Sequence, residues 1–143
     1  MANTLYEKDF YAWTIETAKA LKEKAFNKVD IEHLIEELDD MGASQRNELE
    51  SRLGVLLAHL LKWQFQPSHR GKSWELTIKE QRRKISRRLN KTPSLKSKVD
   101  ELLEDAYGDA LLMAQKETGL DEGVFPKICP YSLNQILDES HYP

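Results

Sequence analysis

Two tryptophans and a group of polar side chains flank a turn-rich segment near the middle of the chain, between Trp63 and Trp74. Aromatic walls with a few convergent polar groups can form a pocket for a small ligand. The same residues can instead be structural, because a buried indole N–H needs a hydrogen-bond acceptor and the backbone of a turn needs partners. We prefer the structural interpretation and keep the pocket as the alternative. The candidate pocket residues are His59, Lys62, Trp63, Gln66, Trp74 and Gln81.

A run of basic residues is the second feature that could do chemistry. Residues 62–98 contain 12 Lys and Arg against 2 Asp and Glu, a balance of +10, whereas the remainder carries −13 and the whole chain −3. Guanidinium groups suit phosphate contacts, so the segment 79–91 is a candidate nucleic-acid-binding helix. The near-cancellation of charge favours the alternative, in which the basic helix pairs with acidic helices of the same chain. The candidate binding residues are Lys79, Arg82, Arg83, Lys84, Arg87 and Arg88.

No residue pattern points to catalysis, a metal or a cofactor. Glu36 and Glu37 are adjacent, so on a helix their side chains diverge by about 100° and do not form an acid–base pair. Cys129 is the single cysteine, and its neighbours do not provide the electropositive setting that activates a thiol. The sequence has no His-Glu-x-x-His motif and no glycine-rich phosphate loop. We therefore expect no catalytic residue, no metal site and no cofactor, and we lean against an enzyme.

Apolar residues recur at three- and four-residue spacing along most of the chain, which is the pattern of amphipathic helices. Asn3 or Thr4 can cap the first helix, and Gly42 and Gly119 are expected C-terminal stops. The segment after residue 119 is rich in proline and aromatic residues and is expected to strap across the helices. The predicted helices cover about residues 5–25, 30–42, 44–65, 73–89 and 93–119, with a short one at 132–137. The expected N-caps of the second, third, fourth and fifth of these helices are, in order, Asp30, Ser44, Ser73 and Thr92.

The bulk composition fits one soluble domain. A chain of 143 residues that is 40% hydrophobic and 31% charged has enough apolar material for a core and a solvated exterior. Its longest apolar run, from Leu53 to Leu61, is far shorter than the about 20 residues that cross a bilayer. Its first residues lack the pattern of a signal peptide. We predict an all-α, single-domain bundle of about five helices over residues 1–143, with core helices at about 5–119 and an irregular strap at 120–143, in the cytoplasm and without a membrane contact.

Short blocks of residues, in a fixed order along the chain, also match a known family. The blocks are Asp9-Phe10-Tyr11-Ala12-Trp13, Asp30 with Leu34-Ile35-Glu36-Glu37, His59-Leu60-Leu61-Lys62-Trp63 with Gln66-Pro67, Ser73-Trp74 with Thr77-Ile78 and Gln81-Arg82, Pro93-Ser94-Leu95, Glu117-Thr118-Gly119-Leu120, Phe125-Pro126 and Cys129-Pro130-Tyr131. With these blocks the chain resembles, over essentially its full length, the uncharacterised and largely cyanobacterial family called domain of unknown function twenty-nine. The resemblance implies an all-helical fold and a bacterial cytoplasmic setting. It implies no reaction, and no functional residue is carried over.

Three functional hypotheses follow from these observations. The first is a non-enzymatic helical interaction module that binds another protein, which predicts a contiguous exposed apolar patch. The alternative is RNA or DNA binding through the basic helix 79–91, which predicts an affinity that falls steeply with salt. The third is an enzyme centred on His59, Lys62 and the corner between Trp63 and Trp74, and it requires a cavity at that corner.

Overall fold

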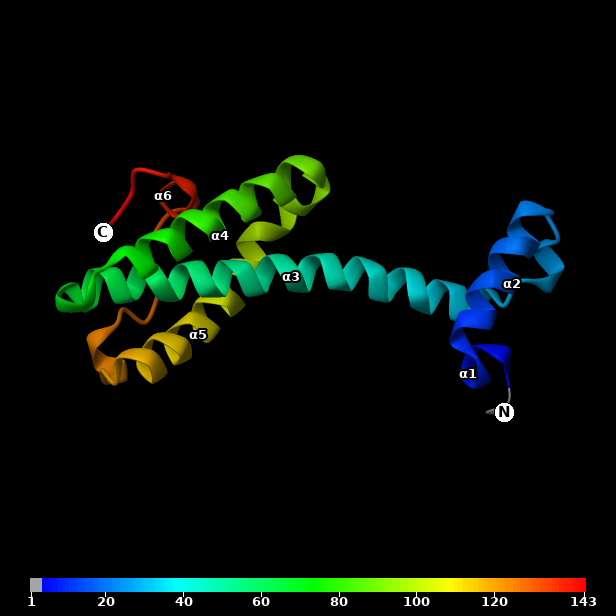
Figure 1. Cartoon of the computed structure of the whole chain (residues 1–143), viewed down its shortest axis with the longest axis horizontal. Coiled ribbons are helices and arrows are strands. Elements are labelled where there is room, and N and C mark those ends of the chain that lie inside the picture. The colour runs from blue at the N-terminus through cyan, green and yellow to red at the C-terminus, as the bar shows by residue number, and fades with distance from the viewer. Residues whose placement is uncertain (1–3) are drawn as a thin grey trace. The chain divides into compact units, whose positions relative to one another are not determined.

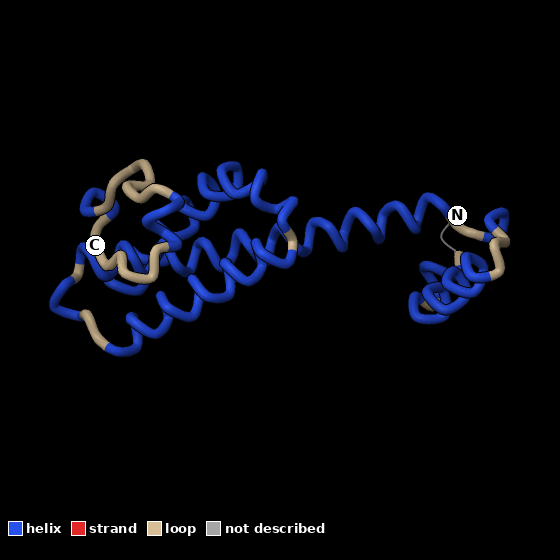
Figure 2. The backbone as a smooth tube through the Cα atoms, turned by 90° about the horizontal axis from the view of Figure 1, so that it is seen from above, coloured by secondary structure: helices blue, strands red, loops and turns tan. Residues whose placement is uncertain are grey.

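The regular structure of this chain is helical throughout residues 4–143, the part that the computed structural model describes (Figures 1 and 2). The predicted all-α fold is therefore confirmed. Described residues up to Ser44 form one compact unit, and residues from Gln45 to Pro143 form a second. The predicted single domain over residues 1–143 stays a prediction. The α-helices are α1 (Leu5–Lys8), α2 (Phe10–Lys22), α3 (Ile31–Phe65), α4 (Lys72–Lys91), α5 (Val99–Thr118) and α6 (Leu133–Leu137).

The first predicted helix, residues 5–25, is divided at Asp9 into α1 and α2. Asp9 has φ −151° and ψ 87°, which breaks the helix, and its carboxylate accepts a hydrogen bond from the Ala12 N–H at 3.0 Å. Aspartate favours this position because it satisfies an amide that has no partner inside the helix. Thr4 caps α1 by accepting from the Glu7 N–H at 3.3 Å. The other proposed cap, Asn3, lies outside the described residues.

Helix α3 covers two predicted helices, and the predicted break between residues 42 and 44 is wrong. Gly42 lies inside the helix and does not take the positive φ that a glycine stop requires. A glycine inside a helix costs only about 1 kcal/mol relative to alanine, which the continuing hydrogen bonds offset. Ser44 is a helix residue and not a cap, whereas Asp30 does cap α3 by accepting from the His33 N–H at 3.3 Å.

The second unit is built on the later part of α3. Its leucine stripe is fully buried and packs against inner faces of α4 and α5, and these two helices lie along α3 in both views (Figures 1 and 2). A Cβ added at Gly54 would lie 3.6 Å from the Ala106 carbonyl, which shows how closely α3 and α5 approach. The buried leucines are Leu49, Leu53, Leu56, Leu57, Leu60 and Leu61.

Two helix starts differ from the predicted ones, and one helix end is confirmed. The N-cap of α4 is Gly71, without a side-chain cap, so Ser73 lies within the first turn. The residues after Thr92 form a 3₁₀ helix at Pro93–Lys98 before α5 begins, and Thr92 makes no capping hydrogen bond. Gly119 ends α5 as predicted, with the positive φ of 73° that glycine tolerates without strain.

The segment after Gly119 packs on the second unit as an irregular strap. Phe125, Tyr131 and Ile136 are buried in the same core as the three long helices. The Tyr131 hydroxyl donates to Gln64 Oε1 at 2.7 Å, and Ser132 forms a capping box at the start of α6. The predicted strap and its short helix are confirmed. Among residues 4–143, none of the helices combines the length and the apolar character that a membrane crossing requires.

Candidate functional site

The polar corner predicted between α3 and α4 is organised around Lys62, of which only 4% is exposed. Its Nζ lies 2.9 Å from Glu117 Oε2 on α5 and 3.4 Å from His59 Nε2 on α3. The same nitrogen lies 4.9 Å from the centroid of the Trp74 ring, which is a cation–π geometry. We call Lys62, His59, Glu117 and Trp74 the Lys62 cluster. Its carboxylate, imidazole and indole together compensate the cost of burying a cationic side chain.

The imidazole of His59 has a defined hydrogen-bonding role in this cluster. Its Nδ1 lies 2.8 Å from the Val55 carbonyl oxygen. A carbonyl oxygen only accepts, so Nδ1 carries the proton and Nε2 accepts from Lys62. Burial lowers the pKa of His59, and the neighbouring Lys62 acts in the same direction. His59 is therefore a neutral, oriented acceptor at neutral pH.

The other predicted corner residues have separate partners. Trp63 packs against Tyr142 of the strap with ring centroids 5.1 Å apart, and Gln66 Nε2 donates to the Thr118 carbonyl at 3.5 Å. Gln81 Oε1 instead accepts from Arg52 at 3.4 Å. The structure thus joins His59, Lys62 and Trp74, and it adds Glu117, which no sequence signal indicated because it lies 55 residues from Lys62. The predicted pocket stays a prediction.

Arg82, one of the candidate nucleic-acid-binding residues, is buried, since only 1% of the residue is exposed. Its Nε donates to the Ile136 carbonyl at 2.7 Å, and its Nη2 donates to the carbonyls of Gln135 at 3.3 Å and His141 at 2.7 Å. The guanidinium carbon also lies 5.4 Å from the centroid of the Tyr142 ring. Arg82 therefore holds the strap and does not face solvent.

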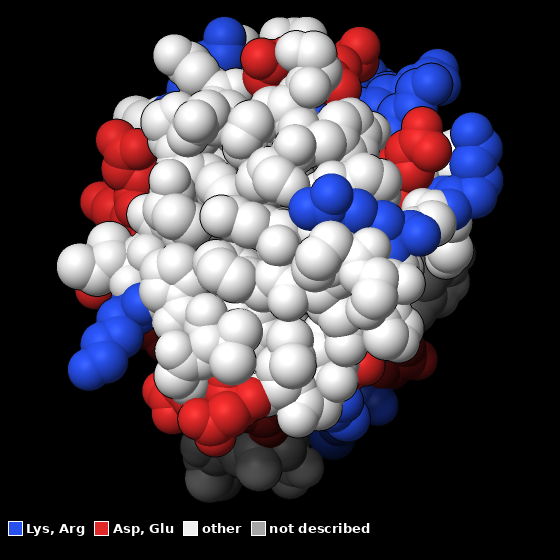
Figure 3. Space-filling view, turned by 90° about the vertical axis from the view of Figure 1, so that its left-hand side faces the viewer, with Lys and Arg blue, Asp and Glu red and all other residues white. Residues whose placement is uncertain are grey.

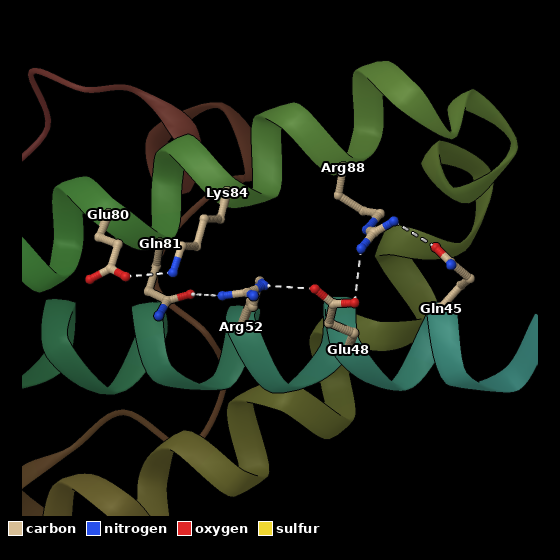
Figure 4. A network of polar contacts seen from close by, with 7 residues as sticks. All are labelled: Gln45, Glu48, Arg52, Glu80, Gln81, Lys84 and Arg88. Carbon is tan, nitrogen blue, oxygen red and sulfur yellow. Dashed lines mark hydrogen bonds and ion pairs between the residues drawn. The ribbon is translucent and has the colours of Figure 1, made fainter.

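Two further cations of the basic helix are paired within the chain (Figure 4). Arg88 donates to Glu48 Oε2 of α3 at 2.9 Å, and the opposite oxygen of Glu48 accepts from Arg52 at 3.2 Å. Lys84 donates to Glu80 within α4. These contacts support the interpretation that part of the basic charge is balanced inside the molecule.

The end of the second unit where the α3–α4 turn and the strap lie is covered mostly by uncharged side chains (Figure 3).

The remaining predicted cations of α4 are exposed and lie in one row. Lys79, Arg83 and Arg87 recur every four residues, and exposed Lys91 continues the spacing. Each step of four residues turns the helix by only about 40° beyond a full turn, so these side chains follow one ridge. We call these four residues the basic ridge. None of them makes an ion pair with another of the residues 4–143.

A third candidate surface lies on the part of α3 that belongs to the first unit. Ile31, Ile35, Leu38 and Met41 are 52%, 53%, 56% and 63% exposed, which is unusual for large apolar side chains spaced along one helix. With half-buried Leu34 they fall within an arc of about 120° on the helix surface. We call these five residues the α3 stripe. The sequence showed their periodicity, but the same periodicity predicts a stripe buried in the chain's own core.

Helix α1 packs on a different side of α3 from the stripe. The Tyr6 ring stacks on the His33 ring with centroids 4.0 Å apart, and the Tyr6 hydroxyl donates to Glu37 Oε1 at 2.5 Å. This hydrogen bond raises the pKa of Tyr6 to about 12. His33 and Glu37 lie roughly 100–140° around the helix from Leu38. The first unit therefore covers a polar side of α3 and leaves the α3 stripe uncovered.

The fold and these surfaces define an all-helical protein with charged and apolar surfaces. Residues 5–142 match the family model described as Domain of unknown function DUF29, and the chain belongs to this family. No curated protein and no solved structure matches the chain. The family resemblance drawn from the sequence blocks is thus confirmed, and membership assigns no role to any residue.

His33 and His59 are expected to titrate on opposite sides of the usual histidine value of about 6.5. A hydrogen bond to Asp30 raises the pKa of His33, so its contribution to stability is present at low pH and is lost as pH rises through that raised pKa. Burial lowers the pKa of His59, so its unfolded form binds protons first and stability is lost as pH falls below about 6.5. Proton NMR of the imidazole signals from about pH 4 to about pH 9, a range that brackets the usual histidine pKa, measures the titration midpoints of both histidines. His33→Gln and His59→Gln assign the signals, and equal midpoints would contradict the two environments.

Replacing Arg82 should destabilise the second unit much more than replacing its neighbour Arg83. Arg82→Ala removes three charge-assisted hydrogen bonds to strap carbonyls and should lower the free energy of unfolding by about 3 kcal/mol. Arg83→Ala alters an exposed side chain and should change stability by less than about 0.5 kcal/mol. Urea unfolding followed by circular dichroism gives the comparison. Similar small effects for both variants would show that the strap contributes little to stability.

Proposed function

We propose that this chain is a non-enzymatic helical interaction module whose first unit binds another protein through the α3 stripe. The observation that carries the proposal is the exposure of Ile31, Ile35, Leu38 and Met41 on one helix face. Apolar anchors at such spacing are the contacts that an amphipathic helix uses in binding a partner. The family resemblance adds a bacterial cytoplasmic setting, which belongs to the same proposal.

The exposed side chains of the α3 stripe provide apolar surface that a partner can bury. Burial of a fully exposed leucine or isoleucine side chain contributes roughly 1.5–3 kcal/mol. The four exposed members of the stripe are each about half exposed, so each can contribute about 1 kcal/mol when a partner covers it. The Lys62 cluster offers less for binding, because its polar groups already contact one another.

Loss of the stripe should abolish partner capture. The variant Ile35→Ser/Leu38→Ser keeps the helix but removes two central anchors. Proteins captured from a cell extract by the immobilised wild-type chain should be lost from this variant. They should be retained by Leu112→Ser, which alters a 68% exposed leucine on α5 in the second unit. Each captured protein is then purified and tested by titration, and unchanged binding to Ile35→Ser/Leu38→Ser would overturn the proposal.

The second candidate function is nucleic-acid binding, and the basic ridge is the observation that favours it. Lys79, Arg83, Arg87 and Lys91 are exposed in one row, so they can contact successive phosphates of one strand. Of the six residues first proposed for this role, Arg82 is buried in the strap contact, and Lys84 and Arg88 hold carboxylates. The ridge retains the remaining three and adds Lys91.

Fluorescence anisotropy with labelled RNA and DNA tests this second function. Affinity should fall steeply with salt, and Arg83→Glu/Arg87→Glu should weaken binding and reduce the slope of log K against log salt by about 2. Leu112→Ser should bind as the wild type does, because Leu112 lies on α5 and not on the ridge. Absence of binding at low salt would end this candidate.

A further inference from the structure

We propose that the partner segment seated on the α3 stripe is a basic amphipathic helix, with an apolar seam flanked by lysine and arginine. This inference rests on the proposed function and specifies the chemistry of the partner. It depends on three features of the first unit: the extent of the stripe, the acidic residues beside it, and the absence of cations on the same stretch of α3.

The α3 stripe has the dimensions of a helix-binding surface. From Ile31 to Met41 it extends about 15 Å along the helix, which is close to three turns. Gly42 continues the same face, and a Cβ added there would meet nothing within 4 Å. A position without a side chain next to Leu38 and Met41 lets the backbone of a second helix approach closely. A helical partner therefore fits this face better than an extended strand, which would need an open sheet edge.

The charge around the stripe is of one sign. Between residues 31 and 44 there are five Asp and Glu and no Lys or Arg, and residues 1–44 as a whole hold ten Asp and Glu against five Lys, a balance of −5. Glu32 and Asp39 project beside one edge of the apolar arc, the edge formed by Ile35, at about 100–120° from the centre line at Leu38. Neither forms an ion pair with another of the residues 4–143. These carboxylates favour a cationic partner and repel an anionic one.

The same charges disfavour a second copy of this surface as the occupant. Two α3 stripes packed antiparallel would place Glu32 and Asp39 of both copies on the same side, and like-charged flanks destabilise helix pairs. Parallel packing would offer these carboxylates no cation, because residues 31–44 contain no Lys or Arg. Helix α4 is basic, but it lacks a free apolar seam, because Ile78, Ile85 and Leu89 are buried in its own core. The partner that satisfies both the apolar seam and the charge is a cationic amphipathic helix of another protein.

Three labelled peptides of about 20 residues test the inference, a length at which a helix can form on binding. The first has a leucine seam with lysine and arginine flanks, the second has the same seam with glutamate flanks, and the third has basic flanks with a glutamine seam. Each is titrated with the full chain by fluorescence anisotropy. The first peptide should bind at least about tenfold more tightly than either of the others.

Variants of the chain assign that binding to the stripe. Ile35→Ser/Leu38→Ser should weaken binding of the first peptide by about tenfold or more, whereas Leu112→Ser should not change it. Glu32→Gln/Asp39→Asn should weaken it and reduce its salt dependence, because these variants remove the flanking charge. Circular dichroism confirms that each variant keeps its helix content. Equal binding of the acidic peptide, or unchanged binding to Ile35→Ser/Leu38→Ser, would overturn the inference.

Failure of the basic-helix inference can be distinguished from failure of the proposed interaction module. A protein partner that is lost from Ile35→Ser/Leu38→Ser but whose docking segment is acidic or neutral would overturn the basic-helix inference and leave the interaction module in place. A concentration-dependent dimer in sedimentation analysis that the same variant abolishes would identify a second copy as the occupant, which also overturns the inference. A monomeric chain that prefers the basic peptide supports it.

Discussion

The second unit depends on one constraint, which is that six leucines of α3 must be removed from water on all sides. A stripe this wide needs more than one covering element, so α4 and α5 pack along α3 and the strap fills the remaining gap. Gly54 permits a close approach of α5 to α3, because a Cβ added there would lie 3.6 Å from the backbone carbonyl oxygen of Ala106. Burying these apolar surfaces is the main source of stability, and the polar contacts decide which elements cover which face.

Buried cations supply that selectivity in the second unit. Lys62 connects α3 to α5 through Glu117, and Arg82 connects α4 to the strap through three backbone carbonyls. Each cation is costly to bury without its partners, so an alternative packing of the helices would leave a charge unsatisfied. The basic character of the middle of the sequence thus has three uses: internal anchors, surface ion pairs and an exposed ridge. Net charge alone does not distinguish them.

Much of the fold follows from local patterns that sequence analysis can detect. Apolar periodicity located the helices, and Thr4, Asp30 and Gly119 marked helix ends that the structure confirms. The break at Asp9 was missed although aspartate is a favoured cap, because the apolar pattern continues across it. At Gly42 the error was the reverse: a helix end was predicted where the helix continues, because glycine weakens a helix without ending it. Such boundary errors arise where two weak local preferences compete.

The candidate sites were harder to predict, because they depend on residues far apart in the sequence. The pairing of Lys62 with Glu117 and of Arg82 with residues 135–141 has no local signature. Arg82 was a candidate for binding nucleic acid, but it is buried, because carbonyls of the strap accept hydrogen bonds from its guanidinium. For the α3 stripe, the apolar periodicity was visible in the sequence, but whether the chain's own core covers this face was not. Periodicity shows that a face will be covered, and it does not distinguish cover from the same chain and cover from another.

The contact between Arg82 and the strap also bears on how the chain matures during translation. The carbonyls that receive the guanidinium lie 53, 54 and 59 residues further along the sequence. At 5–20 residues per second, Arg82 leaves the peptidyl-transferase centre roughly 3–12 s before those acceptors are synthesised. Throughout that interval the inner face of α4 carries a cation with its intended acceptors still missing. The contact between α4 and the strap can therefore form only after the last residues of the chain have been synthesised.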